Sequence, residues 1–148
     1  MSKVAGIHNK SPETYPGPRA KSTVLQTLSK VQPPGSVPLS AATSLLGAAG
    51  PLMFTPLVAA NAVFLFSGVL QAGSPGTTTV SLVDLTTSTT ESSITVEVPA
   101  GTNPVPFSMV FEVTGLSAGV PQTFDVQGTT AGTSSALDSS LVAIVATA

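Results

Sequence analysis

A long uncharged stretch constrains this chain more than any other feature of its sequence. The segment from Val31 to Val83 contains no Asp, Glu, Lys, Arg or His. All five basic residues come before it, and six of the seven acidic residues come after it. Charged residues make up 8% of the chain and hydrophobic residues 42%, whereas a typical soluble domain is roughly 25% charged. This composition indicates a folded or membrane-associated chain whose basic beginning and acidic remainder meet different surroundings.

The beginning of the chain predicts an extended basic arm, residues 1–38, attached to a body of residues 39–148. Prolines at three of the first twenty positions oppose a helix or a hydrogen-bonded strand. Residues 20–32 have the apolar spacing of a short helix, although their Thr and Val residues favour an extended segment about as well. A disordered tail is the plainer interpretation, and an arm that orders on a partner is the sharper one. The arm residues expected to bind a partner are Lys3, Lys10, Tyr15, Arg19, Lys21 and Lys30.

The centre of the uncharged stretch, residues 39–73, is long enough for a transmembrane span. Glycine and proline residues interrupt it, however, and no basic residue follows it. Its last part, Ala62–Gln71, is rich in β-branched and aromatic residues and has the length of a strand. Because neighbouring positions are all apolar there, we expect a strand covered on both faces. Buried β structure is the prediction, and a membrane protein using residues 39–72 is an alternative.

Alternation of apolar and polar residues dominates residues 74–148. Ile94, Val96 and Val98 alternate with polar neighbours, and the run from Val105 to Val113 is the longest of its kind. With the earlier segments, about seven strands predict an all-β chain, an antiparallel β-sandwich of jelly-roll connectivity. The residues expected in the core or at an oligomer interface are Phe64, Phe66, Phe107, Phe111, Phe124, Val142 and Ile144.

The residue types of the body exclude most catalytic chemistry. From Val31 onward the chain has no His, Lys, Arg, Cys, Tyr or Trp, so a Ser-His-Asp triad and a Schiff-base lysine are impossible there. Glu97 and Glu112 are expected to be solvated surface acids, without the aromatic platforms that sugar clefts use. No phosphate-binding glycine loop or EF-hand spacing is present, although a Ca²⁺ site from scattered oxygen ligands stays open. We therefore expect no enzyme, no cofactor and no nucleic-acid partner, since the basic residues are too sparse for the last.

The surface expected for this body predicts self-association. Sandwiches usually protect their edge strands with lysines and other charges, and no lysine follows Lys30. The apolar runs Ala62–Leu70 and Leu141–Ala146 also exceed what one small sandwich can bury. Neighbouring copies would cover such surfaces in a closed symmetric oligomer, for which we expect a homotrimer.

A family resemblance supports the same architecture. The segment VPFSMVFEVTGLSAGVPQTFDVQGTTAGTSSALDSSLVAIVA resembles the C-terminal half of small trimeric viral jelly rolls of the TNF-like kind. With a basic, proline-rich arm, the chain is similar to decoration (cement) proteins of tailed-phage capsids, particularly those of thermophilic phages. The resemblance covers about residues 70–148. It implies a structural protein, made in the host cytoplasm, that sits as a homotrimer on the capsid surface of the virion. There it binds the major capsid protein and lashes neighbouring subunits with its arm, with no nucleic acid or membrane as partner.

A second functional class stays open from the sequence. A head fibre or a receptor- or glycan-binding virion module has the same general build, although the scarcity of aromatic residues in the loops counts against it. The membrane alternative predicts a protein that needs detergent.

Overall fold

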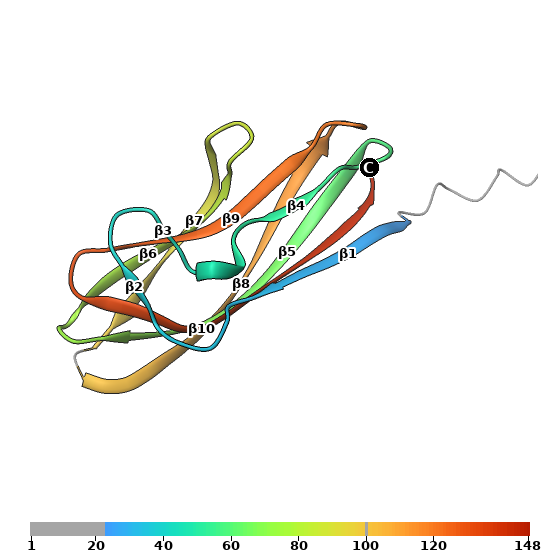
Figure 1. Ribbon diagram of the computed structural model, residues 1–148. Coiled ribbons are helices and arrows are strands. Elements are labelled where there is room, and N and C mark those ends of the chain that lie inside the picture. The colour runs from blue at the N-terminus through green and yellow to red at the C-terminus, as the bar shows by residue number, and fades with distance from the viewer. Residues whose placement is uncertain (1–22, 100) are drawn as a thin grey trace, which may run out of the picture.

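The computed structural model describes residues 23–99 and 101–148, and it shows an all-β chain of two antiparallel sheets packed face to face (Figure 1). One short 3₁₀ turn, η1 (Gly47–Ala49), is the only helical segment among these residues. The strands are β1 (Val24–Val31), β2 (Val37–Leu39), β3 (Thr43–Ser44), β4 (Leu52–Phe54), β5 (Ala60–Ala72), β6 (Gly76–Asp84), β7 (Thr89–Val98), β8 (Gly101–Leu116), β9 (Gln122–Thr130) and β10 (Ser134–Thr147).

The order of the strands is that of a jelly roll. Sheet A has the order β1-β10-β5-β8, with the short β2 beside β10 on the same edge as β1. Sheet B has the order β3-β9-β6-β7, with the short β4 also beside β9. If β1 with β2, and β3 with β4, are each taken as one interrupted strand, eight strands form two four-stranded sheets connected as in a double Greek key. The predicted antiparallel β-sandwich is confirmed.

The core lies between the sheets and is built from alternate residues of each long strand. On β5 the even-numbered residues are buried, among them Phe64 and Phe66. Phe124 of β9 reaches across from sheet B, and its ring centroid lies 4.6 Å from that of Phe64. Phe111 is also buried, while Phe107 is half-buried beside Phe66. Five of the predicted core residues therefore lie in or against the core.

The uncharged stretch has a structural explanation. It runs from the end of β1 to the end of β6 and supplies strands to both sheets, including β5 near the centre of sheet A. Charged side chains are almost never buried without a partner, so strands inside a two-layer sandwich favour this composition. Within the described residues, no helix is long and apolar enough to cross a membrane.

The structure differs from the sequence-based expectation mainly at the edges. Strands β1 and β2 belong to sheet A, although all of β1 and the first two residues of β2 fall within the range 1–38 that was assigned to the arm. Residues 24–31 are extended, not helical, because β1 pairs with β10 along its length. Strand β8 begins at Gly101, before the alternating run that starts at Val105, and it tolerates prolines because it is an edge strand.

Candidate interaction surfaces

The outer face of sheet A carries a continuous row of apolar side chains. Leu65 of β5 lies opposite Val110 of β8 on one side and Val142 of β10 on the other. Val63 lies next to it along β5 and opposite Ile144. These five residues, here called the sheet A strip, alternate with buried core residues and therefore point away from the core. In the single chain Leu65 is 40% exposed and Val110 69% exposed.

Uncharged side chains border the strip on both sides. Thr27 and Ser29 of β1 lie opposite Ile144 and Val142, and a row of three serines crosses the neighbouring position of β8, β5 and β10. Two of these serines, Ser67 and Ser140, share a hydrogen bond of 2.8 Å. Acidic residues occur only at its margins: Glu112 lies opposite Val63 at the β8 edge, and Asp138 lies opposite Val69 beyond the serines.

The outer face of sheet B has a different chemistry. Thr79 of β6 lies between Thr95 of β7 and Thr129 of β9, and the next outward position, Ser81, lies between a serine and a glutamine. Toward one end of this face Glu97 lies opposite Thr77. Hydroxyl and amide groups keep their hydrogen bonds to water, whereas exposed Val, Leu and Ile gain about 25 cal/mol for each Å² that leaves water. Burial against another surface is thus favoured on sheet A far more than on sheet B.

The edge strands of sheet A are blocked in ways that the sequence argument did not foresee. Strand β8 carries Pro104 and Pro106, and β2 carries Pro38, each of which removes a backbone donor. Lys30, excluded from the body in that argument, lies on the edge strand β1, where its Nζ donates a 3.1 Å hydrogen bond to the carbonyl oxygen of Ala49. Blocked edges favour association through a sheet face over the addition of another strand.

The described chain begins at Thr23, beside the last strand, and residues 1–22 before it are called the arm from here on. The backbone N–H of Thr147 donates to the carbonyl oxygen of Thr23, and the N–H of Thr23 donates to the hydroxyl of Thr147, both at 2.9 Å. Lys30 is the one proposed arm residue that the structure places. The others lie outside the described residues: Lys3, Lys10, Tyr15, Arg19 and Lys21.

One carboxylate is buried on the outer side of sheet B. Asp125 points away from the core, as its alternation with Phe124 and Val126 predicts, but it is only 4% exposed. Burial raises its pKa, and hydrogen bonds from Ser44, Gln127 and the backbone of Val126 partly oppose that rise. Alternation along β9 would by itself leave Asp125 in solvent, but the segment containing Ser44 covers it.

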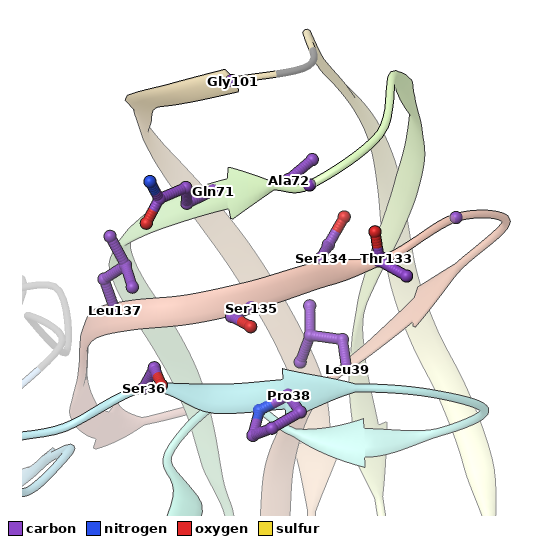
Figure 2. A pocket seen from close by; sticks show the side chains of 12 residues that line it. Ser36, Pro38, Leu39, Gln71, Ala72, Gly101, Thr133, Ser134, Ser135 and Leu137 are labelled. Carbon is purple, nitrogen blue, oxygen red and sulfur yellow. The ribbon is translucent and has the colours of Figure 1, made fainter.

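A hollow of about 620 Å³ opens at one end of the sandwich (Figure 2). It lies between β2, the end of β5 and the β9–β10 turn, and its rim includes Gln71, Thr133, Ser134 and Ser135. None of its lining residues is charged. Across the described part of the chain, no three His, Cys, Asp or Glu side chains gather as metal ligands would.

Comparisons with known proteins show likeness in structure alone. No protein-family model matches the sequence, and no curated protein matches it. Dimeric latent PorU from Porphyromonas gingivalis is similar with a TM-score of 0.43 and 13% identity, over 88% of this chain and 14% of PorU.

Virus particles are also among the similar structures. A mutant VP2 protein of infectious bursal disease virus in derived T=1 particles has a TM-score of 0.35 and 14% identity, over 80% of this chain and 29% of that one. The Gt strain of the same virus gives 0.35 and 17%, over 84% and 31%. The chain spans less than a third of each of these proteins, and matches this distant assign it neither a function nor a partner.

Proposed function

We propose that this chain is a structural protein of a virion, which binds the outside of a capsid as a homotrimer and reinforces the shell. The observation that carries the proposal is the sheet A strip, an apolar row on a sheet face whose acidic residues lie at the margins. The family resemblance of residues 70–148 and the charge separation along the chain support it.

Charge favours a second copy of the chain as the partner of the strip. The body carries six acidic residues, so copies that approach each other through most of its surface repel one another. On sheet A the acidic residues lie at the margins of the strip. The serine and threonine hydroxyls around the strip can hydrogen-bond to the same hydroxyls of a second copy as well as to water. Apolar side chains with an uncharged rim describe the usual anatomy of a subunit interface.

The arm supplies a second kind of contact. Twenty-two residues precede Thr23, and a chain of that length spans up to roughly 70 Å when fully extended, which is enough to reach a neighbouring subunit. Its basic residues suit an acidic shell surface. Three arms on one trimer would bind in parallel, so the combined attachment exceeds that of any single arm.

The test uses shells of the virus that encodes this chain, prepared without it. The full chain should have the solution mass of three copies and should sediment with the shells. Deletion of residues 1–22, which ends before β1, should keep the mass and the unfolding temperature and abolish co-sedimentation. Shell binding by the deletion variant would contradict the role of the arm, and absence of binding by the full chain would contradict the function.

A glycan-binding virion module is the second candidate, because the hollow in Figure 2 presents hydroxyl and amide groups without charge. A glycan array that gives hits lost on Gln71→Ala, with folding unchanged, would favour it over the capsid role.

A further inference from the structure

Three exposed apolar side chains lie on two neighbouring loops at one end of the sandwich. Leu57 is 87% exposed and Val58 44% exposed in the β4–β5 loop, and Val120 is 41% exposed in the β8–β9 loop. The two loops are tied together, because the N–H of Gly119 donates a 2.7 Å hydrogen bond to the carbonyl oxygen of Pro56. We call these three residues the loop patch.

The arm starts beside the loop patch. Ala59 directly follows Val58, and its carbonyl oxygen accepts a 3.0 Å hydrogen bond from the N–H of Ala148. The preceding residue, Thr147, is the hydrogen-bond partner of Thr23, where the described chain begins. Figure 1 shows the start of β1, the C-terminal end of β10 and the β4–β5 loop at one end of the body.

We propose that the loop patch is the surface through which the body itself docks on the capsid shell, next to the arm. The inference rests on the proposed function and adds a contact to it. Neither loop contains a charged residue, so the patch fits an apolar area of the shell protein beside the acidic area that suits the arm.

Charge argues against a second copy as the occupant of the patch. Two copies joined end to end through their loop patches would bring the two Thr23 residues together, and the basic residues Arg19 and Lys21 come just before Thr23 in the sequence. Like charges that are brought close together repel each other. A shell surface that is acidic beside its apolar area has no such cost, and the arm and the patch then bind it side by side.

The experiment compares Leu57→Ser with the matched control Val31→Ser in the full chain, using the same virus shells. Val31 is also an exposed aliphatic residue, but it lies at the end of β1 that is far from the loop patch, where it pairs with Ser140. Because Leu57 lies outside the core, its variant should keep the mass and the unfolding temperature of the parent. We expect shell affinity to fall about tenfold for Leu57→Ser, as for a central apolar contact, and to stay within about twofold for Val31→Ser.

Three results would overturn the inference. If Leu57→Ser binds shells like the parent while deletion of residues 1–22 abolishes binding, the arm alone attaches the protein and the proposed function stands. If Leu57→Ser lowers the solution mass, the patch is a contact between copies. If the full chain does not bind shells at all, the inference and the proposed function fail together.

Discussion

The hydroxyl of Ser44 donates a 2.7 Å hydrogen bond to the carboxylate of Asp125, a residue 81 positions later in the sequence. Ser44 also accepts a hydrogen bond from the N–H of Leu46, so it joins the buried carboxylate to the turn that covers it. The carboxylate stays buried because its oxygens have partners within this local network.

The burial of Asp125 predicts a specific pH dependence. Its pKa in the folded chain is raised above the unfolded value of 3.8, so its stabilising contribution is complete below that value and is lost as the pH rises through the folded pKa. Asp125→Asn keeps an acceptor for Ser44 and never ionises. At pH 7 we expect the variant to have a larger free energy of unfolding than the parent, with the difference shrinking as the pH falls toward 4.

Urea unfolding at both pH values measures this difference. Asp138→Asn, which removes an exposed carboxylate from β10, is the matched control for the loss of one formal charge. A variant at Asp125 that is less stable than the parent at pH 7 would contradict the assignment.

A charge placed in the sheet A strip should separate the copies. Leu65→Asp puts a carboxylate between Val110 and Val142, where association would bury it without a partner. Because Leu65 faces outward, the fold should survive and the mass by light scattering should fall to that of one chain. Thr95→Asp on the outer face of sheet B should leave the mass unchanged. A parent protein that is monomeric at micromolar concentration would contradict the interface.

Gly68 should resist substitution even though it lies within a strand. A Cβ atom at this position would lie 3.0 Å from ring atoms of both Phe107 and Phe66, closer than side chains normally approach. Gly68→Ala should therefore lower the free energy of unfolding by about 1–3 kcal/mol. In a Phe107→Leu background the cost should be smaller, because one of the two rings is gone. Equal costs in the two backgrounds would show that the contact with Phe107 is not the cause.

Lys30 should contribute to stability through its bond to Ala49. Lys30→Met keeps much of the aliphatic stem but removes the donor, and we expect a loss of about 1 kcal/mol in urea unfolding. Its separate role as a partner contact, predicted from its place in the basic segment, is measured by shell binding of the same variant.

The sequence predicts the long strands well because each of them encodes its two faces locally. The alternation from Val105 to Val113 and from Ser92 to Val98 is visible without any tertiary knowledge, and β8 and β7 include those residues. It predicts edges poorly. Strand β1 is exposed along most of its length and shows no clear period, so only its pairing with β10 defines it.

The interaction surfaces were predictable in part. Val142 and Ile144 were singled out because their segment is apolar on both faces, and they lie in the sheet A strip. Leu57 could not be singled out, since nothing local distinguishes an apolar loop residue from a strand residue. The burial of Asp125 depends on a contact across 81 positions, and no local pattern reports such a contact.

The hydroxyl-covered outer face of sheet B has a consequence for the surroundings the protein tolerates. Serine and threonine do not titrate at ordinary pH, and salt does not screen their hydrogen bonds to water as it screens charges. A particle coated with this face would keep its hydration from dilute buffer to brine. It would also offer few fixed charges to which charged molecules could adhere.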